Sequence, residues 1–297
     1  MSRTGTEVDA QHGTESVPPA DAFALIRNET RLSILEALWE ADEQLMRFSE
    51  LNEAVGMRDS AQFNYHLSKL TDQYIRKTDN GYELRTAEAK VVRAILAGSF
   101  TQHPQFGPFE ISDGCTRCGE DLVASYTDET LAIDCHACGR GHGQYPFPPG
   151  GLRNRTNGEI LAAFDQRVRH LHCLAKDGVC PECGGRMHTI ISREGECCLG
   201  VGLRADFTCE QCSHSLCSAI GLSLLDQSEV VAFYRDHGVD LGTEPYWQLE
   251  WCVSDDQTVV RSTDPWRLDV TITLGEGALR TTLDGGLNLI ETEVRDH

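Results

Sequence analysis

The sequence has few basic side chains and almost no lysine. Its 297 residues carry 46 acidic and 26 basic side chains, which give a formal net charge of -20, and only four of the basic residues are lysine. Hydrophobic residues make up 40% of the chain, so the acidity belongs to the surface of a globular protein and not to a disordered acidic segment. Taken over the whole chain, this charge argues against nucleic-acid binding, which usually requires a basic surface.

Long hydrophobic runs are also absent. No stretch approaches the roughly 18 apolar residues that a membrane span needs, and the polar first 20 residues lack the apolar centre of a signal peptide. We therefore expect a cytoplasmic protein without a membrane partner, whose residues 1–20 are a disordered tail. Scarce lysine together with abundant aspartate suggests a halophilic protein from a salt-rich cytoplasm, in which charges are strongly screened.

Common catalytic signatures are missing as well. The chain contains neither H-E-x-x-H nor G-x-S-x-G, and no H-x-E triplet precedes a cysteine pair. Aspartate and histidine are available, but they form no recognisable catalytic constellation. We expect that the protein is not an enzyme, and a metal-dependent nuclease or hydrolase is the least favoured hypothesis.

Cysteine, in contrast, is abundant. Eight of the 13 cysteines form C-x-x-C pairs, which we call knuckles, and the knuckles follow one another at intervals of 16 and 25 residues within two groups. Two thiolates in one tight turn and two in another complete a tetrahedron around a single ion. The spacing therefore predicts two structural four-Cys zinc sites, each in a zinc ribbon. Their ligands would be Cys115, Cys118, Cys135 and Cys138, and then Cys180, Cys183, Cys209 and Cys212.

The remaining cysteines leave alternatives open at the second site. Cys197, Cys198 and Cys217 flank it and could replace one of its ligands, whereas Cys173 and Cys252 are interpreted as small buried side chains. A metal or redox sensor is the less favoured interpretation of both sites. Strands are predicted between the knuckles of each ribbon, at residues 122–126, 130–134, 187–191 and 203–207.

Residues 21–100 combine helical periodicity with a hairpin signal. We expect a first apolar helix near Phe23, a second from about Asn28 or Thr30, a short third helix capped by Ser49, and a fourth capped by Asp59 or Ser60. The Asn-Gly pair at residues 80–81 predicts the turn of a hairpin, and a final helix capped by Thr86 follows over residues 87–97.

The rest of the chain is predicted to be α+β. Linkers are expected over residues 99–114 and 145–151, and helices over 157–176, capped by Asn157, and over 226–237. Antiparallel strands are expected at 247–253, 258–261, 266–274, 278–283 and 287–293. The predicted domains are a tail (1–20), a DNA-binding domain (21–100), the first ribbon with its connector (101–150), and an effector or assembly domain that contains the second ribbon (151–297).

The N-terminal pattern resembles a known family. Asn-Glu-Thr-Arg-Leu-Ser-Ile-Leu at 28–35, Phe-Ser-Glu-Leu at 48–51, Phe-Asn-Tyr-His-Leu-Ser-Lys-Leu at 63–70 and Gly-Tyr-Glu-Leu at 81–84 are similar to ArsR-type winged helix-turn-helix regulators of the haloarchaeal kind. The likeness covers residues 21–100. The whole layout also resembles archaeal regulators that join this domain to an acidic, ribbon-bearing tail.

The resemblance implies that residues 59–72 are a recognition helix for double-stranded DNA, that the hairpin is a wing, and that the protein is a homodimer. It places DNA contacts at Ser60, Gln62, Asn64, Tyr65, His66 and Lys69 on the helix, and at Arg76, Lys77 and Arg85 on the wing. The family's cysteine metal sensor is missing, because no cysteine precedes position 115.

The charge objection weakens when the chain is divided. Residues 21–100 hold 10 basic and 13 acidic side chains, whereas residues 101–297 hold 15 and 30. We therefore expect a sequence-specific transcriptional regulator. The alternative is a basal factor that resembles the large subunit of TFIIE and contacts RNA polymerase.

Overall fold

The computed structural model describes residues 18–71, 73–85, 89–100, 102–104, 106–193 and 200–296. These residues have the α+β fold that the sequence predicts, and all of their sheets are antiparallel. They form two compact units, unit 1 within Met1–Leu96 and unit 2 within Ala97–His297. Most of the predicted tail lies outside the described residues. A membrane-crossing helix would have to be longer and more apolar than any that the described residues form.

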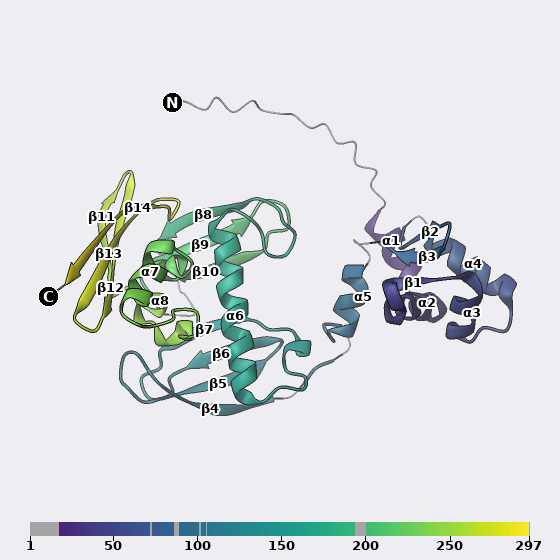
Figure 1. Ribbon diagram of the computed structural model, residues 1–297, viewed down its shortest axis with the longest axis horizontal. Helices are drawn as coiled ribbons and strands as arrows, with labels where there is room; N and C mark the ends of the chain where they lie inside the picture. Colours follow the sequence, from purple (N-terminus) through teal and green to yellow (C-terminus); the bar gives the residue numbers. More distant parts are fainter. Residues whose placement is uncertain are drawn as a thin grey trace, which may run out of the picture. The chain divides into compact units, whose positions relative to one another are not determined.

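Unit 1 consists of short helices around a small sheet. Three helices, α2, α3 and α4, pack their apolar sides together, and the sheet has the strand order β1-β3-β2 (Figure 1). The helices are α1 (Pro19–Ile26), α2 (Glu29–Glu40), the 3₁₀ turn η1 (Asp42–Gln44), α3 (Phe48–Val55), α4 (Ser60–Leu70) and α5 (Ala89–Leu96). The strands are β1 (Leu45–Met46), β2 (Ile75–Thr78) and β3 (Gly81–Leu84).

The predicted start of α2 near Asn28 and the predicted Asp59 cap are confirmed, and the predicted Ser49 cap is wrong. Asn28 accepts from the N–H of the third residue of α2 at 3.2 Å, and Asp59 accepts from two N–H groups at the start of α4, at 2.9 and 3.1 Å. Ser49 caps nothing, because α3 already begins at Phe48. The earlier start places the Phe48 ring 5.1 Å from the Phe63 ring, where it packs against the core. The predicted cap Thr86 lies outside the described residues.

The hairpin turn consists of Asp79 and Asn80, and Gly81 is already the first residue of β3. Its φ is 151°, and a Cβ at this position would lie 2.4 Å from the carbonyl oxygen of Met46 on β1. The glycine therefore permits β1 to pair with β3. The predicted Asn-Gly turn is displaced by one residue for this reason.

Replacing Gly81 by alanine is expected to destabilise unit 1 by about 2 kcal/mol, because β1 must move away from β3. Hydrogen exchange of the β3 and α2 amides in the full chain measures the loss. Gly56→Ala is the matched control: this glycine has a left-handed φ of 72°, but nothing lies within 4 Å of its missing Cβ. An equal loss in both variants would show that backbone conformation alone, without the clash, determines the effect.

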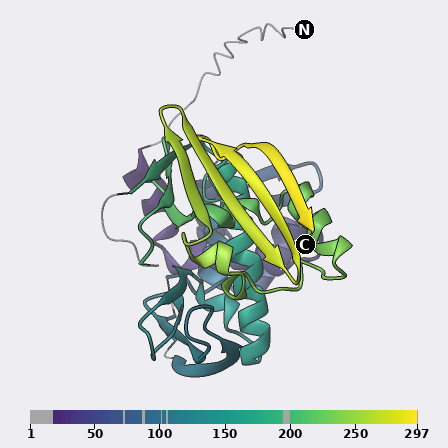
Figure 2. The same cartoon turned by 90° about the vertical axis from the view of Figure 1, so that its left-hand side faces the viewer.

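Unit 2 contains two ribbons, one long helix and a C-terminal sheet (Figures 1 and 2). The first sheet is β4 (Phe106–Gly114), β5 (Asp121–Thr127), β6 (Thr130–Asp134) and β7 (Gly141–Pro146), and the second has the order β10-β9-β8. Its strands are β8 (Met187–Ser192), β9 (Arg204–Cys209) and β10 (Ser215–Ala219). The third sheet is β11 (Thr258–Thr263), β12 (Trp266–Leu274), β13 (Gly277–Asp284) and β14 (Leu289–Asp296).

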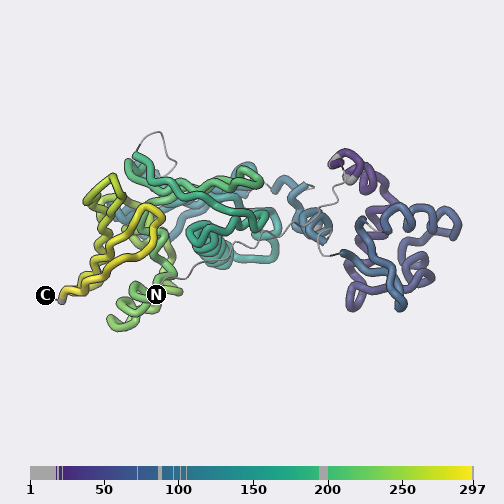
Figure 3. Tube along the Cα trace, turned by 90° about the horizontal axis from the view of Figure 1, so that it is seen from above, coloured from purple at the N-terminus to yellow at the C-terminus, as the bar shows by residue number. Residues whose placement is uncertain are grey.

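The helices of unit 2 connect these sheets into one hydrophobic core. They are η2 (Pro149–Gly151), α6 (Asn157–Lys176), η3 (Ile220–Leu224), α7 (Ser228–Asp236), η4 (Tyr246–Gln248) and α8 (Glu250–Val253). Figure 3 shows α6 nearly end-on, with strands of the unit around it. Its buried side includes Ile160, Phe164, Val168 and Leu171, which belong to the same core as residues from both ribbons and from the C-terminal sheet.

Three predictions about unit 2 are wrong. Residues 247–253 belong to η4 and α8 and are not a strand. Their side chains alternate between buried and half-buried up to Trp251, as in a strand, but the segment packs into the core of unit 2 as short helical turns. The predicted linkers contain β4 and part of β7, which extend the first ribbon sheet to four strands. The cap of α6 is Thr156, whose hydroxyl accepts from the N–H of Glu159, and not Asn157.

Candidate nucleic-acid interface and candidate metal centres

Helix α4 has one buried side and one exposed polar side. Phe63, Leu67 and Leu70 recur at helical spacing and are buried in the core of unit 1. Five of the predicted contact residues are exposed on α4, namely Ser60, Gln62, Asn64, Tyr65 and Lys69. The ammonium of Lys69 lies 5.7 Å from the centroid of the Tyr65 ring, which itself is 53% exposed. Because Asp59 caps α4, the helix and its exposed polar side chains begin at Ser60.

His66 does not belong to this exposed side. Its side chain is only 8% exposed, and it lies three residues after Phe63 and four before Leu70, on the core side of α4. Its ring packs edge-on against the Tyr65 ring at 5.4 Å. A polar side chain was expected to face solvent, but its helical position places it towards the core. The structure therefore removes His66 from the exposed contact set.

The three predicted wing residues are all exposed. On β2, the guanidinium of Arg76 donates to the carboxylate of Glu83 on β3 at 2.6 Å, because the two residues are directly opposite in the antiparallel register. The ammonium of Lys77 lies 5.9 Å from the Tyr82 ring centroid. Arg85 follows β3 directly. The charge of Arg76 is thus offset within the hairpin.

The eight predicted cysteine ligands form two compact groups. Within each group all four sulfur atoms lie within 4.8 Å of one another. The shortest Sγ–Sγ distances join opposite knuckles: 3.7 and 3.5 Å in the first group, and again 3.7 and 3.5 Å in the second. A tetrahedron with metal–sulfur bonds of about 2.3 Å has edges of about 3.8 Å. Both groups are therefore positioned to hold a metal ion.

All four knuckles share one backbone turn. The N–H that follows the second cysteine donates to the carbonyl of the first, at 2.8 to 3.1 Å. The N–H of the first cysteine in turn donates to the carbonyl five residues later, at 2.7 to 2.9 Å. The residue after the second cysteine must adopt the left-handed backbone conformation. In three knuckles this residue is a glycine (Gly119, Gly139 and Gly184), and in the fourth it is Ser213, at φ 58°.

One thiol in each group is predisposed to ionise. Burial opposes ionisation of Cys135, but hydrogen bonds from Cys138 and Cys118 outweigh it and lower the pKa of the thiol to about 7. Burial likewise opposes ionisation of Cys209, and the N–H groups of Cys212 and Gln211 lower its pKa to about 7. A thiolate at neutral pH is the form that captures a metal ion.

The cysteines outside the knuckles have different surroundings. Cys252 is buried, and burial raises the pKa of its thiol well above the ordinary value. Cys217 is half-buried on β10 and does not belong to the second four-Cys group found among the described residues. Cys173 is also only half-buried, and its thiol donates to Asp226 at 3.1 Å. Cys197 and Cys198 lie outside the described residues.

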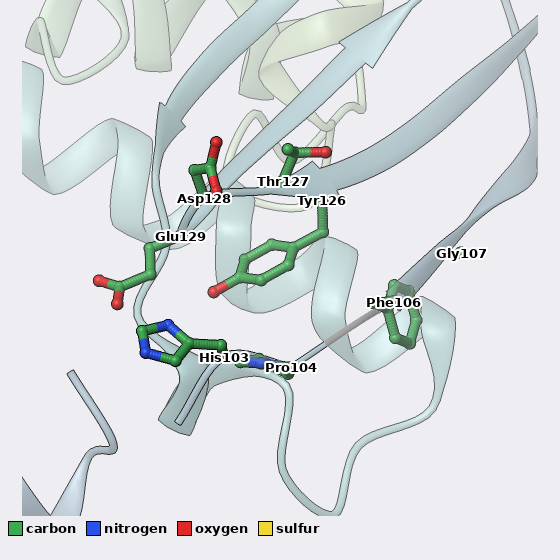
Figure 4. Close-up of a pocket in the computed structure, with 8 residues that line it drawn as sticks. All are labelled: His103, Pro104, Phe106, Gly107, Tyr126, Thr127, Asp128 and Glu129. Carbon is green, nitrogen blue, oxygen red and sulfur yellow. The ribbon is translucent and has the colours of Figure 1, made fainter. Parts of the chain in front are cut away.

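Sequence reasoning missed two further features. Cys173, Asp177 and Asp226 bring their ligand atoms within 4.8 Å of one another, although Asp226 is 53 residues away from the cysteine. An open cavity of about 630 Å³ in unit 2 is lined by His103, Tyr126, Asp128 and Glu129, among others (Figure 4). The Tyr126 hydroxyl donates to the carbonyl of Phe147 at 2.9 Å, so this hydroxyl has a structural role.

Comparison with known proteins places most of the chain in one family. Residues 112–289 match a domain of unknown function, DUF7351, and residues 19–95 match another domain of unknown function, DUF7347. No curated protein and no solved structure matches the chain. The first match contains both four-Cys groups and most of the C-terminal sheet, and it spans more than half of the 297 residues. The chain therefore belongs to the DUF7351 family.

Proposed function

We propose that the protein is a sequence-specific, DNA-binding transcriptional regulator that inserts α4 into the major groove. One observation carries this proposal: α4 exposes two side-chain amides, Gln62 and Asn64, at the two edges of the side that is fixed in the core through Phe63. Glutamine and asparagine can each form two hydrogen bonds with the edge of an adenine. A rigid helix that presents such side chains is suited to reading a base sequence.

The order of elements in unit 1 supports the same proposal. Helices α2, α3 and α4 are followed by the β2–β3 hairpin, and β1 completes the small sheet, as in winged helix-turn-helix domains. In this arrangement Lys69 and the hairpin cations approach the phosphate backbone. We infer an ArsR-like regulator that acts in the cytoplasm as a homodimer, with α1 and α5 as its dimer surfaces.

The two four-Cys groups are proposed to hold structural zinc. Zinc favours four thiolates in a closed tetrahedron, and the sulfur distances of both groups suit it. When bound, the ion would cross-link the two knuckles of each ribbon. Cys115, Cys118, Cys135 and Cys138 would hold one ion, and Cys180, Cys183, Cys209 and Cys212 the other.

Selection from random duplex DNA with the purified full-length protein, at several salt concentrations, tests the function. We expect enrichment of one motif, and a palindromic motif for a homodimer. Because residues 21–100 carry more acidic than basic side chains, the affinity should rest on base contacts more than on released counterions. Recovery of no motif would contradict the proposal. If chromatin immunoprecipitation finds the protein at nearly every promoter of the genome, the alternative function, a basal transcription factor, is favoured instead.

Replacing Glu83 by glutamine is expected to raise the DNA affinity about two- to five-fold. The change removes the carboxylate that pairs with Arg76, whose side chain is 70% exposed, and leaves the guanidinium for phosphate. Fluorescence anisotropy with the selected duplex measures the effect. Glu276→Gln, at an exposed turn of unit 2, changes the net charge equally and serves as the control. An equal gain in both variants would assign the effect to net charge alone.

A further inference from the structure

The two four-Cys groups differ in the buried side chain that follows their last cysteine in the sequence. His142 lies four residues after the last cysteine of the first group, and Leu216 lies four residues after the last cysteine of the second. Both side chains are buried, at 0% and 6% exposure. The first group therefore has a polar side chain at a position where the second has an apolar one.

His142 connects the first group to η4 and α8. Its Nε2 lies 3.3 Å from the sulfur of Cys115, and its Nδ1 donates to the carbonyl of Trp247 at 3.0 Å. The imidazole thus contacts a metal-ligating sulfur on one side and the backbone of residues 246–253 on the other. We call these residues, which form η4 and α8, the 246–253 segment.

More hydrogen bonds hold this segment to the same knuckles. Just before the first knuckle, Asp113 accepts from the indole N–H of Trp247 at 2.8 Å, and the carbonyl of Gly114 accepts from Gln248 at 3.1 Å. Two residues after the second knuckle, Arg140 donates to the carbonyl of Val253 at 3.1 Å. Both knuckles of the first group are therefore bonded to the 246–253 segment.

The far side of the segment is bonded to α6 and α7. The N–H of Tyr246 donates to Asp165, on α6, at 2.8 Å, and Asp165 forms a buried ion pair with Arg169 at 2.7 Å. The indole N–H of Trp251 donates to the hydroxyl of Tyr234, on α7, at 3.0 Å. A continuous polar network therefore runs from Cys115 to the helices of unit 2.

The second group has no such network among the described residues. The hydrogen bonds of its knuckles stay within residues 178–214, as in the bond from the N–H of Glu210 to the carbonyl of Arg186 at 3.0 Å. Two of its four cysteines, Cys183 and Cys212, are exposed. Among the residues that the structure describes, the hydrogen bonds of its knuckles therefore do not reach the 246–253 segment.

We propose that metal binding at the first four-Cys group fixes the 246–253 segment through His142, so that this group controls the order of unit 2, whereas the second stabilises only its own ribbon. Without an ion, the four sulfurs no longer share a centre, and Cys115 can leave its place beside His142. The imidazole ring then loses its packing contact with the sulfur, and the segment loses its connection to the knuckles. The inference rests on metal binding as proposed above, and not on DNA binding.

Two matched cysteine variants of the full-length protein test this coupling. Cys118→Ser and Cys183→Ser each remove one exposed ligand, one from each group. After reconstitution with Zn²⁺, native mass spectrometry should show two ions in the wild-type protein and one in each variant. Hydrogen exchange of residues 246–253 should accelerate at least about tenfold in Cys118→Ser and change less than about twofold in Cys183→Ser. Equal acceleration in both variants, or none in either, would overturn the proposal.

His142→Leu then tests the residue itself, since it copies Leu216 of the second group. We expect this variant to keep both ions but to release the first to a chelator about tenfold faster, with the second unchanged. If His142→Leu does not fold, His142→Gln replaces it, and the cysteine pair still decides the coupling. Unchanged release would exclude His142 as the link. A wild-type protein without Zn²⁺ would overturn this inference and the metal sites together, whereas absent DNA binding would overturn only the proposed function.

Discussion

Replacing both Gln62 and Asn64 by alanine is expected to weaken binding to the selected DNA sequence about 100-fold. Each amide that forms two hydrogen bonds with a base contributes about 1–3 kcal/mol of discrimination, so the loss of both costs about 2–6 kcal/mol, a range that begins at about 30-fold and includes 100-fold. Binding to unrelated duplex DNA should change less than about twofold, because that binding depends on phosphate contacts. Both side chains are exposed, and alanine favours a helix, so α4 should remain folded.

Lys69→Ala provides the contrast in the same helix. It removes a cation and not a base-reading group, so we expect weaker binding to every sequence and a salt dependence lowered by about one charge. Fluorescence anisotropy at several salt concentrations, with the selected duplex and with a scrambled one, separates the two behaviours. If the double variant loses affinity equally for both duplexes, Gln62 and Asn64 contact phosphate, and another part of the protein reads the sequence.

The sequence predicts features that depend on neighbouring residues. The Asp59 cap and the Phe63, Leu67, Leu70 stripe locate α4 almost to the residue, since both signals act within three helical turns. The C-x-x-C spacing predicts both four-Cys groups, because each knuckle is a turn of only four residues. The Arg76–Glu83 pair can also be predicted from the sequence once the register of the hairpin is known.

Features that depend on burial are not visible in the sequence. His66 is polar and was expected on the exposed side of α4, but its helical position is buried. In residues 247–251 apolar and polar side chains alternate as in a strand, yet the segment folds as η4 and α8, because its packing in the core overrides the local pattern. Strand β4 contains Pro108 within an irregular part of its register, which made it resemble a linker. The contact between His142 and Trp247 joins residues 105 positions apart, beyond the reach of any local pattern.

Acidification below pH 6.5 is expected to destabilise unit 2 through His172. This side chain is buried, and burial lowers its pKa from the ordinary value of 6.5 to about 3. The folded protein therefore keeps the imidazole neutral, while the unfolded chain binds a proton below pH 6.5, so stability is complete above this pH and falls as the pH decreases towards 3. Between pH 7.5 and 5.5 the loss should be about 1.3 kcal/mol, and each further unit adds about 1.4 kcal/mol.

Urea unfolding of the wild-type protein and of His172→Phe, compared at each pH, isolates this contribution from those of the carboxylates and cysteines. The ring of His172 packs edge-on against the rings of Tyr145 and Phe207, at 5.2 and 5.9 Å, so phenylalanine suits the site. The variant leaves the Tyr145 hydroxyl its bond to the carbonyl of Cys217, at 3.4 Å, but removes the group that titrates. The difference in unfolding free energy between the two proteins should therefore grow as the pH falls from 7.5 to 5.5. A difference that stays constant over this range would show that His172 takes up its proton equally in the folded and unfolded protein, and that burial does not hold it neutral.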